Sequence, residues 1–223
     1  MHIGLIGGIG PAATDAYYRR LVAEMRARDV PLEMTVVHAD SPVLLRHLAA
    51  EDTGAQAEIF AGLTERLQAA GAGCVAVTSI AGHFCIDAFR TRSPLPVVDL
   101  LWTVREAVDA LGHRCVGLMG TATVMRTGFY GALGPVQTLA PEGCDLETVH
   151  EAYVGIAAAG TASPERTATL LAAGQALVDR GADAVLLGGT DLALVYDPIE
   201  PPYPIIDCVE IHVAALVEMA AAP

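Results

Sequence analysis

Two short segments of the sequence carry side chains that can move protons. The first, Thr78–His83, contains the hydroxyl of Ser79 and the imidazole of His83. The second, Gly188–Asp191, ends in the carboxylate of Asp191. A serine hydroxyl is a poor base unless a neighbour activates it, whereas a carboxylate can act as a general base when burial raises its pKa. The segments therefore contain groups that could carry acid–base chemistry, and Ser79, His83 and Asp191 are the candidate catalytic residues.

Each candidate also has a structural alternative. Asp191 can instead orient a loop or cap a helix. His83 can relay a proton with Ser79, but no third residue that would orient a triad is identifiable, and a structural hydrogen bond is the alternative. The sequence leaves these alternatives open.

A third segment, Gly7–Thr14, follows the first apolar run and opens a predicted helix. Backbone N–H groups at a helix N-terminus bind anions, so Gly8 and Pro11 are candidates to contact a carboxylate or phosphate; the alternative is a plain tight turn. The segment is not a dinucleotide fingerprint, because Pro11 interrupts the glycine spacing and the next apolar run ends at His38 instead of an acidic residue. We predict no cofactor.

The elements that must position these segments alternate between short apolar runs and amphipathic stretches. This alternation is typical of an α/β fold, with parallel sheets and right-handed helical crossovers. The predicted strands are Ile3–Ile6, Met34–His38, Cys74–Thr78, Val97–Asp99, Val116–Met119, Ala184–Leu187 and Ile205–Asp207. The predicted helices are Thr14–Arg28, Gly54–Ala70, Leu101–Leu111, Pro164–Arg180 and Glu210–Ala221. All three candidate segments adjoin predicted strands.

The sequence also matches itself in three places that occur in the same order. The first match pairs Gly4, Leu5, Gly7, Thr14 and Tyr17 with Gly117, Leu118, Gly120, Thr127 and Tyr130. The second pairs Leu67, Gly71, Ala72 and Val75 with Leu177, Gly181, Ala182 and Val185. The third pairs Pro94–Asp99 with Pro202–Asp207. Three ordered matches indicate an internal duplication. The duplication predicts two pseudo-symmetric lobes, each a parallel sheet flanked by helices.

The expected lobes are residues 1–100, with a C-terminal helix 209–223 packing back on them, and residues 101–208. Ligands of open parallel sheets bind beyond the carboxyl ends of the strands. We therefore expect the site in a cleft between the lobes.

Composition excludes several classes of function. The net charge is −13, and the 13 basic residues are all Arg and form no basic stripe, so nucleic acid is not an expected partner. The absence of Lys excludes Schiff-base chemistry. Five cysteines without a C-x-x-C pair, and an N-terminus that runs directly into a strand, favour the cytoplasm. No apolar run approaches the ~20 residues of a membrane span, and no histidine spacing predicts a metal site.

Four motifs give the sequence a family resemblance. Together they resemble the aspartate/glutamate/hydantoin racemase superfamily over essentially the whole chain. The motifs are Ile3–Thr14; Gly117–Thr123 with Gly128–Tyr130; Gly181–Asp191; and Ile206–Asp207 with His212. The resemblance implies cofactor-independent proton transfer at the α-carbon of a small acidic amino acid. In that family two thiols, one from each lobe, stand on opposite faces of the carbon. Its members are often dimers, which implies a homodimer here.

The sequence departs from the family at both thiols. Ser79 stands at the first cysteine and Gly189 at the second, while Ile80 and Ala81 replace a polar Asn and Thr. An apolar wall leaves a buried ammonium or carboxylate without partners, so the expected ligand differs from aspartate on that side. Cys85 and Cys208 are candidates for displaced thiols, with burial as inert cysteines as the alternative.

The resemblance also assigns ligand contacts. Arg46 falls where such racemases place a carboxylate-binding arginine, although a solvated helix face is the alternative. The implied substrate-binding residues are Gly8, Pro11, Arg46, Ile80, Ala81, Thr121, Thr123, Gly189, Thr190 and His212. For His212 a packing role is the alternative.

Together these observations predict a racemase-superfamily enzyme. It would act without a cofactor on a small carboxylate or amino-acid-like substrate, by proton transfer at the carbon next to the carboxylate and not by the usual two-cysteine route. The alternatives are a derived single-base decarboxylase, lyase or tautomerase, and a catalytically inactive carboxylate-binding pseudoenzyme.

Overall fold

The computed structural model describes residues 1–221. The chain divides into two compact units: unit 1 is Met1–Thr103 together with the C-terminal helix from Glu210 onward, and unit 2 is Val104–Val209. The boundaries expected from the sequence are 100/101 and 208/209, and the last two residues of the expected C-terminal helix, 222 and 223, lie outside the described residues.

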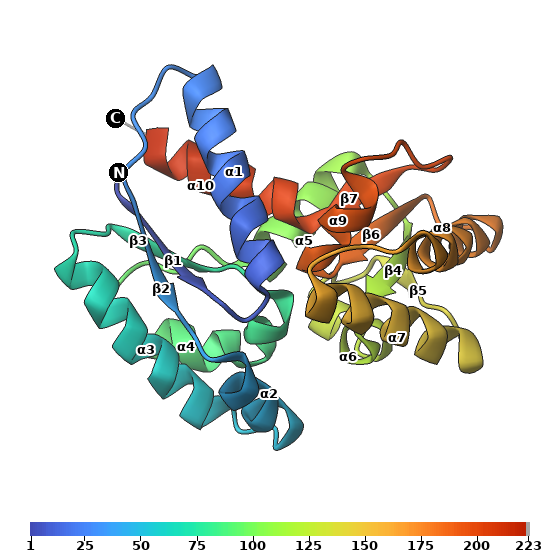
Figure 1. The fold of residues 1–223 in the computed structure, drawn as a ribbon, viewed down its shortest axis with the longest axis horizontal. Helices are drawn as coiled ribbons and strands as arrows, with labels where there is room; N and C mark the ends of the chain where they lie inside the picture. The colour runs from blue at the N-terminus through green and yellow to red at the C-terminus, as the bar shows by residue number, and fades with distance from the viewer. Residues whose placement is uncertain (222–223) are drawn as a thin grey trace. The chain divides into compact units, whose positions relative to one another are not determined.

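Unit 1 is built on a three-stranded parallel sheet. Its strands are β1 (Ile3–Gly7), β2 (Met34–His38) and β3 (Cys74–Val77), in the order β2-β1-β3. Helices α3 (Thr53–Ala69) and α4 (Ile86–Arg92) cover one face, and α1 (Pro11–Ala27) and α10 (Cys208–Ala221) cover the other (Figure 1). Helix α2 (Ser41–Ala49) and the 3₁₀ helix η1 (Ile80–Cys85) complete the unit.

Unit 2 has a four-stranded parallel sheet in the order β5-β4-β6-β7. The strands are β4 (Cys115–Gly120), β5 (Gln137–Leu139), β6 (Ala184–Gly188) and β7 (Ile205–Asp207); the helices are α5 (Leu100–Leu111), α6 (Ala122–Arg126), α7 (Cys144–Ala159), α8 (Pro164–Asp179) and α9 (Ala193–Tyr196), with 3₁₀ helices η2 (Phe129–Gly131) and η3 (Thr190–Leu192). Helix α8 packs on β4 and β6, and α7 lies beside it. The predicted fold class, two α/β lobes with a helix-flanked parallel sheet in each, is confirmed.

Side-chain caps define where several helices begin. The carboxylates of Asp40 and Asp52 accept hydrogen bonds from the N–H groups of Val43 and Ala55, at 3.0 and 2.9 Å, at the starts of α2 and α3. Helix α1 has Pro11 in its first turn, where the missing N–H is harmless. Within residues 1–221, every helix is too short or too polar to cross a bilayer.

One predicted strand needs correction, and α7 is among the elements that the sequence analysis did not predict. The predicted strand at Val97–Asp99 is only an isolated bridge between Val97 and Val75. Pro96 has no N–H to donate to a ladder, and the Asp99 carboxylate accepts from Leu101 N–H at 2.9 Å to begin α5, so pairing stops after one residue. Helix α7 was not predicted, although its buried Leu146, Val149, Tyr153 and Ile156 follow helical spacing.

The repeated residues make equivalent contacts in the two units. A Cβ added to Gly4 in β1 would lie 3.0 Å from Leu67 and 3.2 Å from Ala72. A Cβ added to Gly117 in β4 would lie 2.9 Å from Leu177 and 3.4 Å from Ala182. These are the residue pairs that the sequence matches align, and each glycine lets a helix and its following turn approach the first strand of the unit. The shared contacts support the proposed duplication.

We predict that Gly4→Ala and Gly117→Ala each lower the free energy of unfolding by about 1–3 kcal/mol, because the added methyl overpacks a filled interface. Gly4→Ala should be the more severe, since its methyl would also lie 2.8 Å from the backbone oxygen of Cys74, which cannot rotate away. Gly62 in α3 is the matched control, because nothing lies within 4 Å of its added Cβ. Gly62→Ala should stabilise by about 0.5–1 kcal/mol. Urea denaturation measures all three, and equal effects would contradict the packing argument.

Candidate functional site

The carboxyl ends of β4 and β6 approach closely in unit 2. Gly120 pairs with Gly188, and a Cβ on Gly120 would collide with the backbone oxygen of Gly188. The next residue after β6, Gly189, has φ −147° and ψ 119°, an extended conformation that any residue can adopt. Ser79, which follows β3 in unit 1, has nearly the same conformation, with φ −140° and ψ 129°. The two positions that resemble the family's thiols therefore share a backbone geometry.

The ring of Tyr153 fills the space beside Gly189. A Cβ built on Gly189 would collide with this ring, which comes from α7. Because the backbone of Gly189 is extended, the glycine is required here by the aromatic ring and not by an unusual φ. No side chain of any size fits at position 189 while Tyr153 keeps this place.

Tyr153 also bonds the candidate base of this strand end. Its hydroxyl donates to Oδ2 of Asp191 at 3.2 Å, and both side chains are buried, with exposed fractions of 6% and 3%. Burial, reinforced by the negative charge of Asp191 and by the nearby Cys208, holds the pKa of Tyr153 well above its ordinary value. The phenol therefore stays protonated and acts as a hydrogen-bond donor.

Helix α7 brings a second polar residue to this edge of the sheet. The imidazole Nδ1 of His150 accepts from the N–H of Ala122 at 3.1 Å, just after β4, so the ring carries its proton on Nε2. Thr121 caps α6, the short helix that begins at Ala122, and its Oγ1 accepts from Val124 N–H at 3.3 Å. Sequence reasoning missed His150 and Tyr153 because α7 was not predicted, although their i, i+3 spacing was the available signal.

In unit 1, Ser79 and His83 are joined through the backbone. Nδ1 of His83 donates to the carbonyl oxygen of Ser79 at 2.8 Å, so the imidazole does not contact the Ser79 hydroxyl through this atom. Burial lowers the pKa of His83, against smaller opposing effects of Asp99 and this hydrogen bond, so the ring is neutral. Its Nε2 is buried, and no hydrogen-bond partner reaches it among the described residues. This contact fixes the strand end; it is not the arrangement of a Ser–His relay.

His212 is fully buried in unit 1, on α10. Nε2 donates to the carbonyl of Val98 at 2.9 Å, and Nδ1 accepts from the Tyr17 hydroxyl at 2.7 Å. Burial, and then the neighbouring His83, lower the pKa of His212 to about 3. With both ring nitrogens bonded inside the unit, His212 links α10 to α1 and to the segment before α5, as the packing alternative expects.

The anion-binding segment after β1 is partly self-satisfied. Gly8 has φ +94°, and a Cβ there would collide with the His38 ring. Its N–H donates to Oγ1 of Thr14 at 3.0 Å, and this hydroxyl is also bonded to that of Thr78 at 3.0 Å. Pro11 is exposed. This segment is therefore a turn stabilised by its own hydrogen bonds.

The remaining predicted contacts differ in burial. Arg46 is exposed in the last turn of α2. Ile80 and Thr190 are buried, with exposed fractions of 1% each. Ala81, Thr121 and Thr123 are half-buried.

The two candidate displaced thiols are both buried. The Cys85 thiol donates to the carbonyl of Gly82 at 3.4 Å, and burial raises its pKa to about 12, so it stays protonated at neutral pH. Cys208 is fully buried at the start of α10, near Tyr153. Among residues 1–221, no three His, Cys, Asp or Glu side chains gather as metal ligands.

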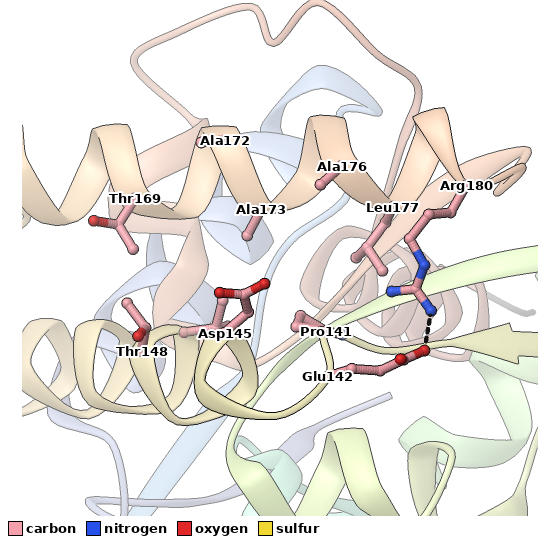
Figure 2. A pocket seen from close by; sticks show the side chains of 11 residues that line it. Pro141, Glu142, Asp145, Thr148, Thr169, Ala172, Ala173, Ala176, Leu177 and Arg180 are labelled. Atoms are coloured by element: carbon pink, nitrogen blue, oxygen red, sulfur yellow. Dashed lines mark hydrogen bonds and ion pairs between the residues drawn. The ribbon is translucent and has the colours of Figure 1, made fainter.

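A groove of about 470 Å³ lies between α7 and α8 (Figure 2). Its floor includes the buried Val149 and Leu177, and an ion pair between Glu142 and Arg180, 2.5 Å long, stands at one end. None of the candidate catalytic residues lines it. Its charged groups are exposed at its rim, so the arrangement offers no buried acid or base.

Comparison with known proteins gives a family and a fold. A family model described as Asp/Glu/Hydantoin racemase matches residues 6–216. An aspartate racemase homologue from Pyrococcus horikoshii superposes with a TM-score of 0.82 and 23% identity, covering 99% of each chain. The aspartate racemase of Picrophilus torridus gives 0.76 and 19%, covering 99% of this chain and 94% of that one. An arylmalonate decarboxylase gives 0.58 and 19%, covering 100% and 94%.

The buried histidines predict acid sensitivity. An unfolded histidine takes up a proton below about pH 6.5, whereas His212 in the folded protein has a pKa of about 3. The stability that is present above pH 6.5 is therefore lost as the pH falls toward 3. His83 acts in the same direction. His212→Gln keeps a donor and an acceptor but does not titrate. Urea denaturation between pH 8 and 3 should show the wild type losing stability relative to His212→Gln, by at most about 1.4 kcal/mol per pH unit. Parallel curves would contradict this assignment.

The contact between Gly189 and Tyr153 predicts strong coupling. Gly189→Ala should lower the free energy of unfolding by about 1–3 kcal/mol, because its methyl meets the ring. In a Tyr153→Ala background the same change should be neutral or stabilise by about 0.4–1 kcal/mol, since alanine restricts the unfolded chain. A double-mutant cycle in urea measures the coupling. If Gly189→Ala has the same effect in both backgrounds, the ring does not dictate the glycine.

Proposed function

This chain belongs to the Asp/Glu/hydantoin racemase family, and from that premise we propose that it is a cofactor-independent enzyme acting on a small carboxylate or amino-acid-like substrate. The proposed reaction is proton transfer at the carbon next to the carboxylate, with Asp191 as the base. The observation that carries this proposal is the buried Asp191 carboxylate at the end of β6, two residues from the position of the family's second thiol.

Desolvation favours Asp191 over His83 as the base. A carboxylate becomes neutral when it accepts a proton, so burial strengthens its hold on that proton. An imidazole becomes charged when it accepts one, so burial weakens it, which agrees with the lowered pKa of His83. Burial therefore argues against His83 as the base and leaves Asp191 as the proposed base.

Ser79 and His83 take other parts in the proposed reaction. The Ser79 hydroxyl is a neutral donor suited to a carboxylate or enolate oxygen. His83, bonded to the Ser79 carbonyl, acts as a positioning residue that holds the strand end. Arg46 is the proposed partner of the substrate carboxylate, because an exposed guanidinium is available for a bidentate contact. Homodimer formation and a cytoplasmic location stay predictions of the sequence.

The fold does not by itself select racemisation. Among the structures with this fold, some are named racemases and one is named a decarboxylase. Both reactions pass a developing negative charge onto a carbon beside a carboxylate. A single-base site suits decarboxylation or tautomerisation as well as exchange, so a derived lyase remains the second candidate within the same chemistry.

Solvent deuterium tests the proposal. We expect wild-type protein incubated in deuterated water with acidic amino acids and dicarboxylates to place deuterium on the carbon next to a carboxylate, as read by proton NMR. Asp191→Asn should slow this exchange by about 100-fold or more, the usual contribution of a general base. The matched control is Asp183→Asn. Asp183 lies just before β6, at the opposite end of the strand from Asp191, and accepts from the N–H groups of Arg114 and Cys115.

Three outcomes separate the candidates. Exchange that survives in Asp183→Asn and is lost in Asp191→Asn supports the proposed base. Release of carbon dioxide from a substituted malonate supports the decarboxylase. Calorimetric binding of a carboxylate with no turnover, unchanged by Asp191→Asn, would replace the proposal with a carboxylate-binding pseudoenzyme.

A further inference from the structure

The residues around Gly189 give the second strand end a specific replacement for its thiol. The Tyr153 ring occupies the space that a side chain at position 189 would need. The hydroxyl of the same residue reaches Oδ2 of Asp191 at 3.2 Å. One residue on α7 therefore both removes the room for a thiol and contacts the nearest carboxylate.

We propose that Tyr153 is a positioning residue that forms, with Asp191, a hydrogen-bonded pair in place of the family's second thiol. This inference rests on the proposed function, and it adds a residue that neither the sequence nor the family resemblance singled out. The phenol donates to one carboxylate oxygen and fixes the orientation of the group that receives the substrate proton.

The proton count of the pair is simple. The Asp191 carboxylate accepts a proton from the carbon next to the substrate carboxylate, and the C–H electron pair passes into the enolate. Asp191 then returns a proton, either the same one or one exchanged with solvent. Tyr153 keeps its own proton throughout, in agreement with the strongly raised pKa that burial gives it.

Among the described contacts, a titratable group from a second helix also faces the pair. Tyr153 comes from α7, and Cys208, at the start of α10, lies near the phenol. A donated hydrogen bond favours the charged carboxylate, so removing the phenol hydroxyl should raise the pKa of Asp191. A purely structural tyrosine would affect stability without moving this titration.

The test follows Asp191 directly by carbon NMR of protein labelled with ¹³C at the aspartate carboxyls, in the full chain without substrate. The Asp191 resonance is assigned by its loss in Asp191→Asn. Tyr153→Phe is expected to move the Asp191 titration upward by about one pH unit, the size expected for a hydrogen bond to a charged group. The acid limb of the pH–rate profile should move by the same amount in the same direction.

Two further variants serve as controls for this test. Replacement of Tyr153 by 3-fluorotyrosine keeps the ring and strengthens the donor, so it should move the Asp191 titration downward. Tyr196→Phe is the matched control, because Tyr196 is buried in the same unit but contacts the Tyr203 hydroxyl at 3.0 Å and not Asp191. Tyr196→Phe should leave the Asp191 titration in place.

The outcomes distinguish this inference from the proposed function. Opposite shifts in Tyr153→Phe and the fluorotyrosine protein support the pair even if no substrate turns over, in which case only the proposed reaction fails. An Asp191 titration that does not move in either protein overturns the pair, even if Asp191→Asn abolishes deuterium exchange.

Discussion

The packing of the Tyr153 ring against the bare Cα of Gly189 constrains everything else at the end of β6. Protein interiors are packed as densely as organic crystals, so a ring and a second side chain cannot share this volume. The proposed loss of a thiol at position 189 therefore goes with a change in packing. An aromatic side chain occupies the space beside Gly189, and its hydroxyl donates to the Asp191 carboxylate.

The end of β3 in unit 1 has the same backbone conformation but a different polar interior. There, buried imidazoles are held neutral, and their tautomers follow from their partners: carbonyl oxygens accept from Nδ1 of His83 and from Nε2 of His212. Desolvation opposes any positive charge on this pair, and each ring would repel charge on the other. The first strand end therefore supplies fixed dipoles and a hydroxyl, whereas the second supplies a carboxylate.

The sequence predicted the skeleton better than the site, for physical reasons. Strands flanked by glycine and the repeated Gly4 and Gly117 are local or periodic features, and the structure bears out the α/β units that they predict. Apolar character predicts a strand at Val97–Asp99, but Pro96 has no N–H with which to extend the ladder beyond the bridge at Val97. Tyr153 and His150 were not predicted as site residues because they contact the strand ends from α7, a helix distant in sequence that was itself not predicted. Residue type alone also could not reveal that His83 bonds the Ser79 carbonyl.

A single carboxylate base has a stereochemical consequence. Racemisation needs a proton removed from one face of the carbon and another delivered to the opposite face, which is why two thiols suit it. If Asp191 is the proposed single base, it returns a proton to the face from which it came, so the expected product of simple exchange keeps its configuration. Inversion would require a second donor, and the protonated groups at the strand ends, a serine hydroxyl and a phenol of raised pKa, are weak acids. The proposed single-base site therefore favours reactions in which the enolate is reprotonated on one face, and the weak acidity of the other groups reinforces this preference.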